Sequence, residues 1–309
     1  MIKYYYKNLR SKQVSELDEY HPGSWVSVQQ PTEDEIAFLI KRFKLEPGHL
    51  EDAMDEDEMP RLEKEGDKSY IFMRYAYTND DLELTTAPLL FIVGPDLLIT
   101  IAHGEIPRMQ RFLTGKVEFA TTQRAKLVLQ ILFQIVDEYE IFINNISRQT
   151  KVIRSRLRGH EIGNQDFVDF VLIEDELNEF LSALLPTTAI LRRLLLGKHM
   201  QLYEEDQDLV EDLLLNNEQS IESCNSNIKT IINIREAYST INSNNLNRSM
   251  KVLTAFTVLI TLPNVVYGMY GMNIPLPFQH EPWAYFFVLP LSLGLSWLVW
   301  MVARKRRIF

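Results

Sequence analysis

Asparagine, threonine and glycine residues recur at intervals of three or four within an apolar stretch near the C-terminus of the chain. The series is Asn247, Met250, Leu253 or Thr254, Thr257, Thr261, Asn264 and Gly268. At 3.6 residues per turn, these positions share one face of a helix. Amide carbonyls and hydroxyls with no charged neighbour can hold a cation, or its bound waters, weakly enough to release it. The pattern predicts either the wall of a hydrated pore or polar contacts between helices.

The element that carries this stripe is a predicted transmembrane helix over residues 251–272. A second uncharged run predicts another span over 282–303, and residues 273–281 form the link between them. About 20 apolar residues suffice to cross a bilayer. A buried hairpin in a soluble protein is the alternative, but two adjacent charge-free runs of this length make it improbable. Since two spans cannot enclose a pore, a pore would require several copies of the chain.

Charge divides the chain into two parts. Residues 1–247 contain 26 basic and 41 acidic side chains, a net −15, whereas residues 248–309 contain six and one, a net +5. An acidic body with an apolar tail excludes a purely soluble enzyme, and a −15 body would repel nucleic acid.

Basic residues predict the orientation of the two spans. Arg248 and Lys251 precede the first span, the basic tail 304–309 follows the second, and the link contains neither lysine nor arginine. By the positive-inside rule, both termini face the cytoplasm of a cell-membrane protein. The N-terminus carries no apolar signal region, and the single cysteine, Cys224, excludes an internal disulfide. In the link between the spans, the negative charge of Glu281 would concentrate cations at the outer mouth of such a pore.

The acidic body begins with a predicted α/β domain over residues 1–121. Tyr70–Tyr77, Leu89–Val93 and Leu97–Ile101 have the composition of strands, and Thr32–Phe43 reads as a helix that begins with a capping box. An antiparallel helical hairpin is predicted for residues 122–197, with a kink expected at Pro186.

A stalk helix is predicted for residues 198–250. The 65 residues between Gly197 and Pro263 contain neither glycine nor proline. A heptad seam runs through this stretch into the first span, so the stalk and the first transmembrane helix should be continuous. The seam could pack against other copies of the chain or against the chain's own hairpin. Its members are Val210, Leu214, Asn217, Ile221, Cys224, Ile228, Ile231, Arg235, Tyr238 and Asn242.

Catalytic motifs are not visible in the sequence. There is no phosphate-binding glycine loop and no His-Glu-x-x-His, and the six histidines are scattered without metal-ligand spacing. We therefore expect neither an enzyme nor an organic cofactor.

The tetrapeptide Tyr270–Asn273 at the end of the first span resembles the YGMN signature of the CorA magnesium transporter family. The context is similar too: residues 247–254 before the span, Pro263 within it, a short link, a second span and a basic end. Segments 49–53 and 60–63 resemble the family's N-terminal pattern. The resemblance implies a funnel-shaped homopentamer whose stalk helix becomes the pore helix, with the second span at the periphery.

The resemblance also implies roles for single residues. Gly271, Met272 and Asn273 would form the selectivity motif, where Asn273 contacts hydrated Mg²⁺. Asn247 would lie at the inner end of the pore and Leu253 at a hydrophobic constriction. Pro263 is displaced by one position from the family's usual pattern, and Thr261 replaces a bulky apolar residue, so the gate should differ in detail.

Regulation by cytoplasmic Mg²⁺ is a further implication of the resemblance, through acidic residues between neighbouring subunits. The candidates on the stalk are Asp206, Asp208, Glu211 and Asp212, and those in a predicted loop are Asp80 and Asp81. A solvated acidic face is the alternative for each. We expect channel-like transport of divalent cations, chiefly Mg²⁺ with Co²⁺ or Ni²⁺ as lesser substrates. A Zn²⁺ transporter of the same superfamily, or a membrane-anchored sensor or scaffold, are the alternatives.

Overall fold

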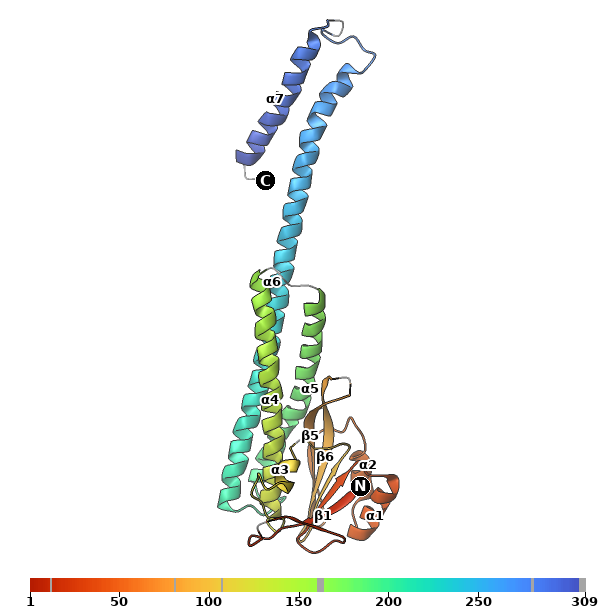
Figure 1. The fold of residues 1–309 in the computed structure, drawn as a ribbon, viewed down its shortest axis with the longest axis vertical. Coiled ribbons are helices and arrows are strands. Elements are labelled where there is room, and N and C mark those ends of the chain that lie inside the picture. The colour runs from red at the N-terminus through yellow and green to blue at the C-terminus, as the bar shows by residue number, and fades with distance from the viewer. Residues whose placement is uncertain (12, 81, 107, 160–163, 279–280, 306–309) are drawn as a thin grey trace. The chain divides into compact units, whose positions relative to one another are not determined.

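The computed structural model describes residues 1–309 except 12, 81, 107, 160–163, 279–280 and 306–309. The chain forms two compact units, an N-terminal unit Met1–Asn233 and a C-terminal unit Ile234–Phe309. Helix α6 (Glu204–Tyr270) contributes residues to both. The predicted order of an α/β domain, a long helix and two apolar C-terminal helices is confirmed (Figure 1).

A seven-stranded sheet is the centre of the N-terminal unit. Its spatial order is β2-β1-β3-β7-β6-β5-β4, and only the β3–β7 pair is parallel among the described ladders. The strands are β1 (Ile2–Tyr6), β2 (Ser15–Leu17), β3 (Trp25–Gln29), β4 (Arg61–Glu65), β5 (Lys68–Thr78), β6 (Leu84–Val93) and β7 (Leu98–Ala102). Strands β5 and β6 contain two of the segments predicted as strands, and β7 begins and ends one residue later than the third, Leu97–Ile101.

Helices cover both faces of the sheet (Figure 1). On one face, α1 (Glu33–Phe43) and α2 (Pro47–Asp52) pack over side chains of β3, β5, β6 and β7. The predicted capping box of α1 is present: Thr32 Oγ1 accepts the N–H of Glu35, and the Glu35 carboxylate accepts the N–H of Thr32. The short α3 (Gln110–Leu113) follows β7. Two long helices, α4 (Arg124–Gly159) and α5 (Asn164–Leu195), contact β5 and β6 from the other face.

The predicted helical hairpin consists of α4 (Arg124–Gly159) and α5 (Asn164–Leu195). Tyr139 of α4 and Phe180 of α5 meet edge to face, with ring centroids 5.1 Å apart. In the N-terminal unit, α6 packs against this hairpin through part of its heptad seam. Asn217 is fully buried, and its Nδ2 donates to the Leu184 carbonyl and the Thr188 hydroxyl, both at 2.9 Å. The part of the seam that lies in the N-terminal unit therefore packs against the chain's own hairpin.

The helix ends differ from the predicted boundaries by several residues. The stalk helix begins at Glu204 rather than at 198, because Gly197 adopts a left-handed φ of +68° after α5. The Asp206 carboxylate then accepts the N–H of Tyr203 at the start of α6.

The C-terminal unit is a pair of helices. It contains the later part of α6 and helix α7 (Ala284–Lys305), and both are long and apolar enough to cross a membrane. Helix α6 ends at Tyr270, two residues before the predicted end of the first span. Helix α7 begins and ends two residues later than the predicted second span.

Candidate functional site

The polar stripe of α6 lies on the surface of the C-terminal unit. Each residue of an α-helix advances by about 100°, so the stripe positions fall within about a third of the helix circumference. All of its members are exposed: Asn247, Met250, Leu253, Thr254, Thr257, Thr261, Asn264 and Gly268. Within one chain, the stripe thus forms a continuous open face.

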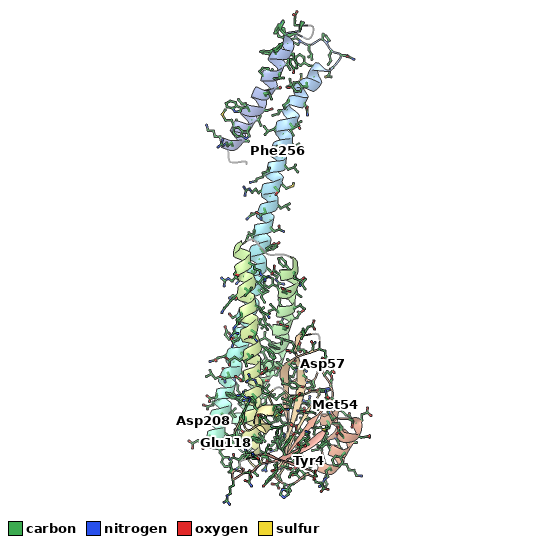
Figure 2. All side chains as sticks on the ribbon, in the orientation of Figure 1. Tyr4, Met54, Asp57, Glu118, Asp208 and Phe256 are labelled. Carbon is green, nitrogen blue, oxygen red and sulfur yellow. The ribbon has the colours of Figure 1, made fainter. Side chains whose placement is uncertain are left out.

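Helix α7 covers the opposite face of α6. Leu259, Leu262 and Val266 of α6 are only partly exposed, and they lie roughly half a turn away from the stripe. The residues of α7 that are buried within the unit are Ala284, Val288, Ser292 and Ala303. The stripe is therefore not the surface that attaches α6 to α7 of the same chain. Figure 2 labels Phe256, another exposed residue of α6 in the C-terminal unit, to locate this part of the helix.

The threonine hydroxyls of the stripe all donate to the helix backbone. Thr254, Thr257 and Thr261 bond the carbonyls of Met250, Leu253 and Thr257 at 2.8, 2.9 and 2.7 Å. Each hydroxyl has a single hydrogen, so its remaining capacity is that of an acceptor. An acceptor pointing outward can bind a cation or a hydrogen of a cation's bound water, which suits the chemistry expected from the sequence.

Two bulky apolar side chains lie on the same face toward the N-terminal end of the stripe. Met250 is 57% and Leu253 64% exposed, and Asn247 precedes them. This end of the stripe is therefore more apolar than its middle, where Thr257 and Thr261 lie.

A turn follows the stripe where α6 ends. The N–H of Gly271 donates to the carbonyls of Tyr267 and Gly268, at 3.0 and 3.2 Å, and the N–H of Met272 donates to Met269 at 3.2 Å. Gly271 has no left-handed φ, and a Cβ there would meet only ordinary contacts at 3.5 Å. The fold of one chain thus does not require glycine at this position. Asn273 is exposed beyond the turn.

The acidic candidates of the N-terminal unit fall into two separate places. Asp208, Glu211 and Asp212 are exposed on the first turns of α6, and Figure 2 labels Asp208 there. Asp206 is 4% exposed and caps the helix start. Asp80 lies in the turn between β5 and β6, and Asp81 lies outside the described residues.

One chain does not bring the two acidic places together. The turn that holds Asp80 lies beside Glu176 of α5, which accepts the N–H of Leu84. From Glu176 to the end of α5 at Leu195 is about 29 Å at 1.5 Å per residue, and α6 begins only after that. Among the described residues, no three His, Cys, Asp or Glu side chains form a group that could hold a metal ion. Glu281 is exposed in the link between α6 and α7.

Residues 23–305 match the family model described as CorA-like Mg2+ transporter protein. The chain belongs to this family. The match confirms the resemblance that the Tyr270–Asn273 segment suggested and extends it over nearly the whole chain. The protein is a membrane transporter of divalent cations.

Relatives in the CorA family are distant in sequence but similar along their full length. The cobalt/magnesium transport protein CorA of Methanocaldococcus jannaschii is 23% identical over 91% of this chain and 90% of its own. The magnesium transport protein CorA of Wolinella succinogenes is 23% identical over 90% and 87%. The complete structure of the M. jannaschii CorA magnesium transporter superposes with a TM-score of 0.87 at 21% identity, over 99% of this chain and 98% of that one. This likeness confirms the CorA fold.

Three polar residues between the CorA-type membrane helices were not singled out by the sequence analysis. Tyr267 of α6 meets Ser292 of α7, and Ser296 of α7 reaches the backbone of α6. Only two weak signals could have indicated them. Pro263 lacks an N–H and so leaves a carbonyl of α6 without its helical donor, and the serines recur at a spacing of four.

Proposed function

We propose that the chain assembles into a homopentameric channel for Mg²⁺ across the cell membrane, with α6 of each copy lining the pore. The observation that carries this proposal is the open polar stripe on α6, opposite the face that α7 covers. In a bilayer, a polar face directed at lipid is costly, so it must face other helices or water. Packing of several α6 helices with their stripes inward satisfies this requirement. The number five is what the resemblance to the family implies.

The uncharged character of the stripe favours a hydrated divalent ion. A ring of carboxylates would hold such an ion too tightly for release, whereas Thr257, Thr261 and Asn264 offer neutral acceptors. Mg²⁺ loses its waters reluctantly, and outward hydroxyl oxygens can accept hydrogens from those waters. We propose Asn273 as the first contact at the outer end, after Glu281 has raised the local cation concentration. Co²⁺ and Ni²⁺ are proposed as lesser substrates.

Both termini are proposed to lie in the cytoplasm. Arg248 and Lys251 stand at one end of the first span, and Arg304 and Lys305 at the corresponding end of α7. No lysine or arginine occurs in the link. The positive-inside rule then puts the N-terminal unit in the cytoplasm, where its acidic surface is exposed to cytoplasmic Mg²⁺.

Closure by cytoplasmic Mg²⁺ is the proposed regulation. Asp208, Glu211 and Asp212 are exposed on α6, while Asp80 lies on a separate edge of the unit, so an ion shared by them would have to join neighbouring copies. Bound Mg²⁺ would offset the repulsion between the acidic N-terminal units of neighbouring copies and favour the closed pentamer. Loss of the ion would favour the open pentamer.

Flux of Mg²⁺ into liposomes that contain the purified protein tests this function, with Asn273→Ala and a control at Asn244→Ala. Asn244 is an exposed residue of α6 on a different face from the stripe. We expect wild type and N244A to carry Mg²⁺, and N273A to carry at least about fivefold less, the effect of losing about 1 kcal/mol of hydrogen bonding. Zn²⁺ flux without Mg²⁺ flux would favour the zinc alternative. Absence of any cation flux would favour a sensor or scaffold.

A further inference from the structure

A hydrogen bond joins the two helices of the C-terminal unit. The hydroxyl of Tyr267 on α6 lies 3.0 Å from Oγ of Ser292 on α7, and Ser292 is fully buried within the unit. Ser292 Oγ also donates to the Leu289 carbonyl at 2.9 Å. Because Ser292 has one hydroxyl hydrogen, the consistent assignment makes Tyr267 the donor between the helices.

Tyr267 also belongs to the turn that ends α6. Its carbonyl accepts the N–H of Gly271 at 3.0 Å, and its neighbour Gly268 is the last member of the stripe. One residue therefore bonds α7 through its side chain and the Gly271–Asn273 turn through its backbone.

A second contact lies two turns earlier on α6. Pro263 has no N–H, so the carbonyl of Leu259 loses its usual helical donor. Ser296 of α7 lies with its Oγ 3.5 Å from that carbonyl, and the same hydroxyl is 3.1 Å from the Ser292 carbonyl. The serine that follows Ser292 by one turn thus approaches the single backbone acceptor that the proline leaves open.

We infer that Tyr267 and Ser292 are a positioning pair, which sets the rotation of α6 and thereby the placement of the Gly271–Asn273 turn and of the stripe. The inference rests on the proposed function. A polar contact at a fixed position prevents α6 from rotating against α7, and a rotation by one residue would move each stripe member by about 100° around the helix. In hydrocarbon, an unpaired hydroxyl has no water to bond, so the pair favours one arrangement.

The consequence for transport is discrimination between ions. Ca²⁺ has the same charge as Mg²⁺ but accepts more variable coordination and loses water more readily. A loosely placed turn should therefore admit relatively more Ca²⁺. The ratio of Mg²⁺ to Ca²⁺ flux measures this, and it does not depend on how many protein molecules are correctly folded.

The test compares Tyr267→Phe, Ser292→Ala and the double variant of the full chain in liposomes, with Tyr285→Phe as the matched control. Tyr285 is a tyrosine of α7 that is 66% exposed. We expect each single variant to lower the Mg²⁺ to Ca²⁺ flux ratio about threefold, the effect of one average interhelical hydrogen bond in a membrane. The double variant should have the same ratio as the singles, because each single change already removes the bond.

Each remaining outcome is decisive. Wild-type ratios in Y267F and S292A, alongside an altered flux in N273A, would overturn the positioning pair and leave the proposed function intact. The pair would also be overturned if the flux ratio of the double variant fell by the product of the two single effects, or if Y285F lowered the ratio as much as Y267F. No cation flux through the wild type would overturn the proposed function and this inference with it.

Discussion

Arg74 of β5 and Glu179 of α5 form hydrogen bonds to the same hydroxyl group, that of Thr86. Arg74 Nε donates to Thr86 Oγ1 at 2.7 Å, and Thr86 Oγ1 lies 3.0 Å from Glu179 Oε1. Arg74 is only 8% exposed, and its guanidinium also donates to the carbonyls of Glu56 and Glu58 at 2.7 and 2.9 Å. A buried charge is thereby paired through a hydroxyl, and the loop after α2, the sheet and the helical hairpin are held together.

Thr86→Val should lower the free energy of unfolding by about 1–3 kcal/mol, the cost of leaving buried polar groups without a partner. Valine keeps the shape of threonine but removes the acceptor of Arg74 Nε and one of the donors to Glu179 Oε1. The remaining bonds of the two side chains, such as that from the Thr86 N–H to Glu179 Oε1, do not involve the hydroxyl. Thr85→Val is the matched control, because the Thr85 hydroxyl donates to Glu179 at 2.7 Å but, among the described residues, forms no hydrogen bond with Arg74. Urea unfolding of the full chain in detergent measures both, and equal losses would contradict the bridging role.

Glu176→Gln should make the N-terminal unit less sensitive to pH. Burial raises the pKa of the Glu176 carboxyl above its ordinary value of 4.5, the N–H of Leu84 opposes this shift, and the charges of Glu83 and Glu179 add to it. A raised folded-state pKa gives stability that is present below 4.5 and is lost as pH rises through the folded value. Relative to wild type, the variant should therefore become more stable between pH 4.5 and 7 and match it at pH 4.

Unfolding midpoints at a series of pH values measure this difference. Asp175→Asn removes the same charge from an exposed position on α5 and serves as the control. A parallel gain in D175N would mean that the general negative charge of the unit, and not the burial of Glu176, causes the effect.

Much of the fold was predictable because its signals are local. The capping box at Thr32 depends on two residues three apart, and the strands β5 to β7 depend on runs of β-branched and aromatic side chains. The partner of the heptad seam was not predictable. A seam specifies that something apolar covers it, and the choice of the chain's own hairpin depends on long-range contacts such as Asn217 with Leu184.

For the candidate site, the shared face of the stripe was predictable, and the contact of α6 with α7 was not. Helical spacing alone placed Thr257, Thr261 and Asn264 on one face, and the structure leaves that face open. Spacing could not show which face of α6 would receive α7, because apolar residues flank the stripe on several sides. The contact between Tyr267 and Ser292 joins positions 25 residues apart. Nothing in a single sequence pairs them.

Cys224 should resist thiol reagents while the chain is folded. The side chain is fully buried, and burial raises the pKa of its thiol to about 12. The thiolate is the reactive form, so maleimide labelling at pH 8 should be on the order of a thousandfold slower than for an exposed cysteine. Ser223→Cys places a thiol on the exposed neighbouring position as the control. Rapid labelling of Cys224 in the native protein would show that α6 separates from the hairpin.

Asp208→Asn combined with Asp212→Asn should weaken closure by internal Mg²⁺. Both carboxylates are exposed on α6, where an ion between neighbouring copies could bind them. The Mg²⁺ concentration that halves the flux should rise about tenfold, since two charged ligands are lost in each copy. Glu222→Gln, also exposed on α6, removes one negative charge farther along the helix. An equal shift in E222Q would indicate diffuse charge screening in place of a site.

Thr261→Val should reduce Mg²⁺ flux about tenfold, which corresponds to a barrier raised by ~1.4 kcal/mol. Valine preserves the shape and removes the outward acceptor. Thr230→Val is the control, because the Thr230 hydroxyl donates to the Ser226 carbonyl at 2.8 Å just as Thr261 donates to Thr257, yet Thr230 lies on the N-terminal unit's part of α6. The two variants lose the same local hydrogen bond. A difference in flux therefore measures the missing acceptor in the stripe. If T261V instead disrupts the oligomer on size exclusion while the remaining assemblies conduct normally, the stripe serves contacts between helices and does not line the pore.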